Sequence, residues 1–246
     1  MIFDIHAHVG HSKYSDNLIT AEAVLKVMDG AGIDRAILLP TASTGRYITA
    51  RQMKAEVDKA PDRLVGFFSS DVKAKDAVDL FTEAVTRYGA MGLKIHPVYA
   101  ACAADDEKWV YPLLERAGEL KVPVMFHSGE APYATPWQIG LAAMDFPGTT
   151  VILEHMGFDA MCFTDAAIKM AKRCENIILG TTGVMYEFPI TKAVNAIGDD
   201  RIVYGGEIPM NNPLHEILKV RLAKVSDEAK EKILGRNIAR ILNIAF

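Results

Sequence analysis

The sequence has few of the features that mark secreted, membrane-spanning or nucleic-acid-binding proteins. Its three cysteines, Cys102, Cys162 and Cys174, lie far apart and form no Cys-x-x-Cys pair. We therefore expect reduced thiols and no disulfide framework. A net charge of -4 gives no electrostatic reason to expect a nucleic-acid or membrane partner. Because there is no basic leader and no apolar run long enough to cross a bilayer, we expect a cytoplasmic protein.

A Gly-rich phosphate-binding loop is also missing after the first strand-like segment, where histidines stand instead. That loop is typical of open, doubly wound sheets. Eight short apolar segments alternate with longer helical patterns, which indicates parallel strands joined by crossover helices. Eight such units in 246 residues suit a closed barrel. We predict the α/β class, with residues 1–246 forming a single (β/α)8 TIM barrel domain.

The predicted elements follow from apolar runs of strand length and from apolar residues at helical spacing. The predicted strands are Ile2–His6, Arg35–Leu39, Leu64–Phe68, Gly92–His96, Val122–His127, Val151–His155, Ile177–Gly180 and Ile202–Tyr204. The predicted helices are Ala21–Ala31, Ile48–Lys59, Lys75–Tyr88, Glu107–Leu120, Trp137–Asp145, Asp165–Arg173, Thr191–Ala196, Pro213–Val220 and a last one near Asp227–Leu242.

The opening of the chain places metal-binding side chains at alternate positions of an apolar strand. Side chains two residues apart point to the same face of a strand, so Asp4, His6 and His8 should line one face. Two converging imidazoles with a carboxylate to orient them form half of a divalent-metal site. The alternative is a pair of buried strand histidines that only bond to backbone carbonyl groups.

Further polar residues stand where other predicted strands end: His96, His127, His155 and Glu207. All carboxyl ends of parallel barrel strands gather on one face, and that face carries the chemistry of such enzymes. Each histidine alone is better explained as a hydrogen-bonded structural residue. Their coincidence on one rim, together with the carboxylate, predicts a metal site.

Lys94 lies two residues before His96, so both should face the barrel interior. Lys94 could reach solvent, pair with a neighbouring carboxylate, bind a substrate carboxylate or, if carbamylated, bridge two metals; we favour the substrate carboxylate. Arg46 could clamp an anionic substrate, although a solvated surface arginine is the simpler account. Glu154 has the opposite parity to His155, and we expect it to face the helices.

Taken together, several segments resemble the amidohydrolase superfamily. The segments are Asp4-Ile-His6-Ala-His8, Lys94-Ile-His96-Pro, His127-Ser-Gly, His155-Met-Gly and Gly205-Gly-Glu207-Ile-Pro. More narrowly they resemble the amidohydrolase-related branch that includes aminocarboxymuconate-semialdehyde decarboxylase, related aromatic-acid decarboxylases and lactone hydrolases. The resemblance covers nearly the whole chain in the same order.

The resemblance implies roles for the matching residues. It implies that His6, His8 and His127 are metal ligands and that His155 polarises the substrate or handles protons. Glu207 takes the place of an aspartate that contacts the metal and accepts a proton from its water. The family pattern there is Gly-Ser-Asp-x-Pro, whereas this chain has Gly-Gly-Glu-x-Pro, so the carboxylate is retained on a side chain one methylene longer.

The resulting hypothesis is a metal-dependent hydrolase of a small amide, lactone or ester. His6, His8, His127 and Glu207 would hold one divalent ion, with zinc favoured over manganese or iron and with two ions as an alternative. His155 and Glu207 would be catalytic. Lys94, His96 and Arg46 would bind the substrate, which we expect to carry a carboxylate.

Other functions remain open at this stage. One is non-oxidative decarboxylation of an aromatic or unsaturated acid by the same residues. Another is a metal-binding barrel that Glu207 leaves catalytically impaired. A third is a metal-dependent phosphoesterase or nuclease, which the lack of a basic surface disfavours. A homo-oligomer is also open.

Overall fold

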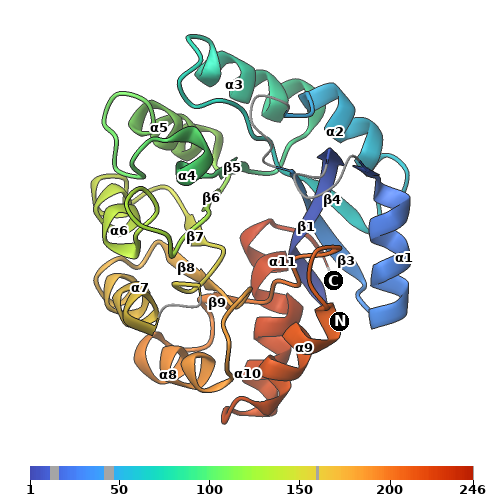
Figure 1. Cartoon of the computed structure of the whole chain (residues 1–246), viewed down its shortest axis with the longest axis vertical. Coiled ribbons are helices and arrows are strands. Elements are labelled where there is room, and N and C mark those ends of the chain that lie inside the picture. Colours follow the sequence, from blue (N-terminus) through green and yellow to red (C-terminus); the bar gives the residue numbers. More distant parts are fainter. Residues whose placement is uncertain (12–16, 42–46, 159–160, 246) are drawn as a thin grey trace.

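The computed structural model describes residues 1–11, 17–41, 47–158 and 161–245. Eight parallel strands form its centre, and a ring of helices surrounds them (Figure 1). The parallel strands are β1 (Phe3–His11), β3 (Arg35–Pro40), β4 (Leu64–Gly66), β5 (Leu93–Ile95), β6 (Val124–Phe126), β7 (Val151–Leu153), β8 (Ile177–Gly180) and β9 (Ile202–Val203). The short β2 (Leu18–Ile19) pairs antiparallel with the end of β1 and was not expected.

Two seams close the strands into a barrel. The strands form ladders in the orders β2-β1-β3-β4 and β5-β6-β7-β8-β9. Phe68, just after β4, bridges to Leu93, and Lys94 N donates to Phe68 O at 2.7 Å. On the other side Ala7 bridges to Ile208, just after β9. These contacts join the edge strands of the two ladders to each other and so confirm the predicted TIM barrel.

Apart from the short α4, which was not predicted, the helices follow the predicted segments, most of them with shifted ends. They are α1 (Ala21–Ala31), α2 (Ala50–Val57), α3 (Ala77–Tyr88), α4 (Pro97–Ala100), α5 (Tyr111–Leu120), α6 (Pro136–Asp145), α7 (Met161–Arg173), α8 (Phe188–Ile197), α9 (Pro213–Leu222), α10 (Asp227–Glu231) and α11 (Asn237–Ile241). A π-helical turn, η1 (Lys232–Arg236), joins α10 to α11, so the single last helix of the prediction is interrupted. Capping boxes at Thr49 and Thr135 satisfy the first backbone N–H groups of α2 and α6.

The interior of the barrel is apolar and closed at one end. Inward-facing residues such as Phe3, Ile37, Phe67 and Met125 form an inner cluster, which Ile238 and Leu242 from the last helical segment also join. A larger cluster fills the space between strands and helices. Because α11 contributes to the inner cluster, a site can open only at the other end, where the strands finish.

β1 contains a register shift that changes which residues point inward. Phe3 and Ile5 belong to the inner cluster, whereas Ala7 and Val9 belong to the outer one. The ladder with β3 shifts between Asp4 and Ala7, as happens when a bulge inserts an extra residue. Uniform alternation along this strand was therefore a wrong prediction. No helix among the described residues is both long and apolar enough to cross a membrane.

Candidate metal centre

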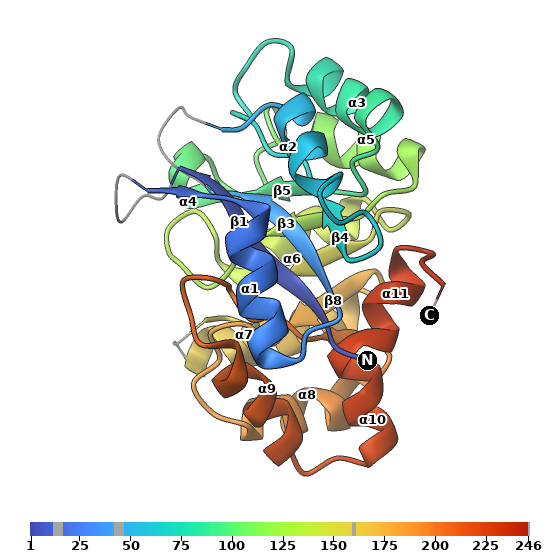
Figure 2. The ribbon, with the colours of Figure 1, turned by 90° about the vertical axis from the view of Figure 1, so that its right-hand side faces the viewer.

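A narrow cleft of about 50 Å³ opens at the carboxyl ends of the barrel strands. The chain ends lie on the other side of the molecule, to the right in Figure 2, whereas α4 and the tip of β1 lie to the left. The cleft is lined by His6, His8, Pro40, Thr41, Lys94, His96, Tyr99, His127, Glu154, His155, Glu207 and Met210. A water molecule needs at least about 10–15 Å³ of cavity volume, so this cleft can hold an ion together with water.

His6, His8 and Glu207 form a group of potential metal ligands. His6 Nε2 lies 2.9 Å from His8 Nε2, and one ligand atom from each of the three residues lies within 4.8 Å of the others. Two nitrogens bound to one ion at about 2.1 Å, at right angles, would be about 3 Å apart. Burial and the neighbouring His8 lower the pKa of His6 well below its usual value. His6 is therefore neutral, which is the form that binds metals.

Asp4 does not orient the two imidazoles, which corrects the prediction made from its spacing. Its Oδ1 accepts from the backbone N–H groups of His6 at 2.8 Å and Gly206 at 2.7 Å. The physical reason is the bulge in β1, which separates Asp4 from the face that carries the histidines. Asp4 instead ties β1 to the loop that carries Glu207.

The backbone around Glu207 is tightly constrained. Glu207 itself has φ +54, and its carbonyl oxygen accepts from the N–H groups of Met210 and Asn211, both at 2.9 Å. A Cβ on Gly206 would lie 2.5 Å from Asp4 Oδ2. Serine, the residue in the family pattern, would not fit there without a shift of Asp4, which explains the glycine.

Glu154 lines the cleft, so the prediction that it faces the helices was wrong. It is 1% exposed and pairs with Lys94 Nζ. Its Oε1 lies 3.0 Å from His127 Nδ1 and 3.2 Å from His155 Nε2. The inward-facing Ile152 lies two residues before Glu154, so Glu154 continues the inward alternation. The buried lysine on β5, two strands away from β7 in the sheet, was the signal that a counter-charge must lie inside the barrel.

Lys94 pairs with a neighbouring carboxylate, that of Glu154, which is one of the possibilities predicted from the sequence. Lys94 is itself 4% exposed. A carbamylated Lys94 would place an anion directly against Glu154, so the carbamylated bridge is disfavoured. Lys94 and His96 both face the cleft, as predicted from their shared parity.

His155 is buried and held in one orientation. Its Nδ1 lies 3.0 Å from Thr182 O, and because a carbonyl oxygen only accepts, Nδ1 carries the proton. Burial lowers the pKa of His155 to about 4, so the ring is neutral near pH 7. Nε2 then presents a lone pair to Glu154 Oε1, and His6, Glu154 and His155 form a second group with ligand atoms within 4.8 Å. Repulsion between these lone pairs favours a proton or cation nearby.

His127 lines the cleft but belongs to neither ligand group. Its ring stacks on His96 with centroids 3.9 Å apart, and its Nε2 lies 3.3 Å from Glu130 Oε2. Tyr99 lies against His96, also at 3.9 Å. The assignment of His127 as a metal ligand therefore stays a prediction. Arg46 lies outside the described residues.

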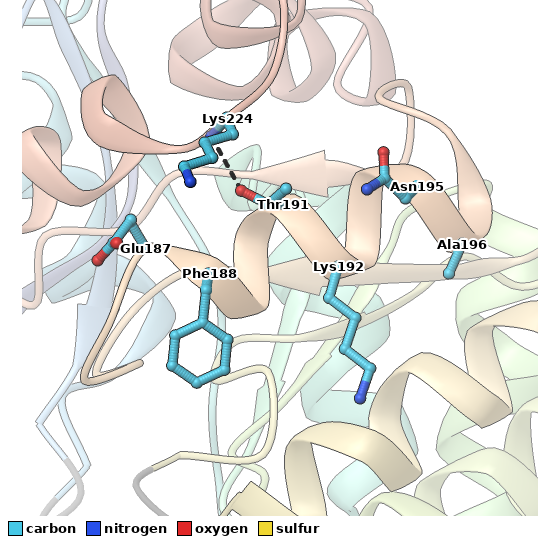
Figure 3. Close-up of a pocket in the computed structure, with 7 residues that line it drawn as sticks. All are labelled: Glu187, Phe188, Thr191, Lys192, Asn195, Ala196 and Lys224. Atoms are coloured by element: carbon cyan, nitrogen blue, oxygen red, sulfur yellow. Dashed lines mark hydrogen bonds between the residues drawn. The ribbon is translucent and has the colours of Figure 1, made fainter.

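A second cavity, of about 440 Å³, lies on the outside of the barrel along α8 (Figure 3). It is lined by Glu187, Phe188, Thr191, Lys192, Asn195, Ala196 and Lys224. One carboxylate and two lysines are present, and the described residues that line it include no imidazole. The cleft at the strand ends is therefore the better candidate for metal chemistry.

Comparisons with known proteins agree with this architecture. A model of the amidohydrolase family matches residues 3–244, and the protein belongs to this family. No protein of curated function matches the sequence.

Solved structures show the same fold over the full chain. An uncharacterised TIM-barrel protein from Bordetella bronchiseptica is 20% identical with a TM-score of 0.83, and the match covers 98% of both chains. A 2,6-dihydroxybenzoate decarboxylase from Rhizobium is 17% identical with a TM-score of 0.76, again over 98% of both chains. A dihydroxybenzoic acid decarboxylase from Polaromonas, solved with manganese and 2-nitroresorcinol, is 17% identical with a TM-score of 0.77, over 98% of this chain and 96% of the other.

Proposed function

We propose that the protein is a metal-dependent, non-oxidative decarboxylase of a small aromatic or unsaturated carboxylic acid. The observation that carries the metal-dependent part is the group of His6, His8 and Glu207 in a cleft at the strand ends. Membership of the amidohydrolase family supports it. The choice of decarboxylation over hydrolysis rests on similarity to decarboxylases of dihydroxybenzoic acids along the whole chain.

His6, His8 and Glu207 would hold one divalent ion, with His127 as a candidate fourth ligand. The donor set fits zinc or manganese, since it combines neutral imidazoles with a carboxylate. Manganese is found in a similar structure. The two ligand groups share His6, and each imidazole nitrogen has one lone pair, which favours one ion per chain. The ion would bind substrate oxygen atoms and withdraw electron density from the reacting carbon.

Decarboxylation breaks the bond between the ring carbon and the carboxylate carbon. The electron pair stays on the ring carbon, a proton takes the place of the departing carbon dioxide, and the net reaction consumes one proton. His155 would move that proton; the contact of Nδ1 with Thr182 O supports this role, since it leaves Nε2 to accept a proton and pass it on. Tyr99 lines the cleft, where its ring could contact an aromatic substrate. Lys94 and Arg46 remain candidates for its carboxylate.

Hydrolysis of a lactone, amide or ester is the second candidate. The observation that favours it is the Glu207 carboxylate beside the two imidazoles, where it could accept a proton from water. Both reactions use the same ligands.

A substrate panel separates these candidates. Metal-loaded protein is incubated with carboxyl-labelled hydroxybenzoic and unsaturated acids and, in parallel, with lactones, amides and esters. We expect labelled carbon dioxide from at least one acid and none from Glu207→Ala or from chelated protein. Hydrolysis of a lactone, amide or ester with no release of carbon dioxide from any acid would overturn the decarboxylase proposal and favour the hydrolase.

A further inference from the structure

A second buried ion pair lies outside the cleft, on α9. Glu216 and Lys219 are 1% and 4% exposed, and their charged atoms are 2.7 Å apart on successive turns of the helix. Burying two charges is costly, and an apolar pair of similar volume would often be as stable. Their other partners indicate what the pair does.

One set of partners lies in the loop after β8. Gly183 N donates to Glu216 Oε2 at 3.3 Å, and Lys219 Nζ donates to Val184 O. The residue just before them, Thr182, supplies the carbonyl oxygen that accepts from His155 Nδ1 at 3.0 Å. The pair therefore fixes the segment that orients His155.

The other partner lies in the loop after β9. Asn211 Nδ2 donates to Glu216 Oε1 at 3.0 Å. Asn211 N also donates to Glu207 O at 2.9 Å, which closes the turn that holds Glu207 at φ +54. The two oxygens of one carboxylate thus bind the two loops that carry the acceptor for His155 and the carboxylate of the metal group.

The helix that bears the pair is itself anchored. Asn212 Oδ1 accepts from Leu214 N at the start of α9. Beyond its end, Lys224 N donates to Thr191 Oγ1 of α8 at 2.9 Å, the dashed line in Figure 3. A carboxylate held on a fixed helix can position loops, whereas one on a loose helix would move with them.

We infer that Glu216 and Lys219 are positioning residues that set the placement of Glu207 relative to His155 by clamping the loops after β8 and β9 together. The inference rests on the proposed function for its catalytic meaning, while the coupling of the two loops does not depend on it. Two buried charges are retained here because both loops need one common partner.

The test compares variants that keep or remove the hydrogen bonds. Glu216→Leu with Lys219→Met replaces the pair by apolar side chains, and Glu216→Gln with Lys219→Met keeps a neutral acceptor for Gly183 N. Manganese affinity is measured by titration, and hydrogen–deuterium exchange is followed in peptides covering residues 181–184 and 207–212. We expect the apolar variant to bind manganese at least about 10-fold more weakly, as typical for residues that orient ligands. Both peptides should exchange faster in the apolar variant. The glutamine variant has one acceptor oxygen, so it should restore slow exchange in residues 181–184 but not in residues 207–212.

Lys232→Met is the matched control, because it removes a half-buried pair with Asp199 and a pair with the exposed Asp200, each at 3.0 Å, remote from the cleft. It should lower the melting temperature without changing manganese affinity or exchange in either loop. An apolar variant that folds with unchanged affinity, or with faster exchange in only one loop, overturns the inference. If the apolar variant does not fold, the glutamine variant decides, and exchange as slow as that of the wild type in residues 207–212 then overturns the inference. If the wild-type protein binds no ion, the proposed function fails and the exchange data alone decide the coupling of the loops.

Discussion

Among single residues, Glu154 has the most contacts with charged and imidazole groups of the cleft. It meets Lys94, His127 and His155 within hydrogen-bonding distance while itself almost fully buried. A carboxylate in that position is stable only with a positive partner, and Lys94 is that partner. Because Lys94 pairs with Glu154, its amine lies beside the second group of potential ligands, which consists of His6, Glu154 and His155.

Removing Lys94 should therefore destabilise the folded protein. Lys94→Met leaves Glu154 buried without its counter-charge, and we expect a loss of about 3–5 kcal/mol in the free energy of unfolding. Lys94→Met with Glu154→Gln removes both charges and should recover most of the loss. Urea unfolding of the metal-free proteins measures both. A Lys94→Met protein as stable as the wild type would show that the ion pair is not the main partner of Glu154.

Asp4 should make stability depend on pH. Burial raises its pKa to about 7 from 3.8, although its bonds to Gly206 and His6 act in the opposite direction. Between these pH values the folded state holds a proton that the unfolded chain has released, so the contribution of Asp4 to stability is largest below about pH 4 and is lost as pH rises to about 7. Asp4→Asn mimics the protonated acid.

Relative to Asp4→Asn, the wild type should therefore lose up to about 4 kcal/mol of unfolding free energy as the pH is raised from 4 to 8. Metal-free protein is used so that ligand binding does not contribute. Parallel stability curves for the two proteins would mean that Asp4 titrates normally.

The length of Glu207 is the residue-level departure from the family pattern. One oxygen of its carboxylate lies within 4.8 Å of a ring nitrogen of His6 and of His8. The glutamate therefore reaches the two imidazoles with its present length. Glu207→Asp should retract the oxygens by roughly 1.5 Å and weaken divalent-ion binding by about 10-fold or more, because ligand placement matters on that scale. If the shorter side chain instead raises affinity or turnover by orders of magnitude, the natural residue impairs the site.

At the scale of elements, most strands and helices could be predicted from the sequence, because apolar period and turn residues are local properties. The predicted ends at His96 and His127 fall only one residue beyond the observed ends of β5 and β6 for this reason. The bulge in β1 could not be predicted, since it arises from pairing with β3. The inward turn of Glu154 was missed because parity was counted from His155, which follows the end of β7, instead of from Ile152 within the strand.

The loop after β9 is the element on which the metal group depends most. Gly206→Ala would place a Cβ 2.5 Å from Asp4 Oδ2 and 2.8 Å from Tyr204 Oη. We expect a loss of about 1–3 kcal/mol in stability together with weaker ion binding, because the next residue is Glu207. Gly30→Ala on the exposed side of α1 meets nothing within 4 Å and should stabilise the protein by about 0.5–1 kcal/mol. Unfolding experiments and ion titrations of both variants test this difference. Equal changes in stability and ion affinity for Gly206→Ala and Gly30→Ala would contradict it.

At the scale of the whole molecule, barrel closure brings residues from distant parts of the chain together. His6 and Glu207 are neighbours because Ala7 bridges to Ile208 across the seam. The alternation of strands and helices predicted this closure, and the amidohydrolase family match confirms the family assignment. Substrate contacts could not be predicted in the same way, because they depend on loop geometry, and Arg46 lies outside the described residues.

The central claim is that His6, His8 and Glu207 bind one divalent ion. The most direct test is elemental analysis of chelated and reloaded protein, with ion affinity compared between wild type and Glu207→Gln. The account predicts about one ion per chain in the wild type and a large loss of affinity in the variant. A wild-type chain that retains no divalent ion, or a variant that binds it equally well, would contradict the account.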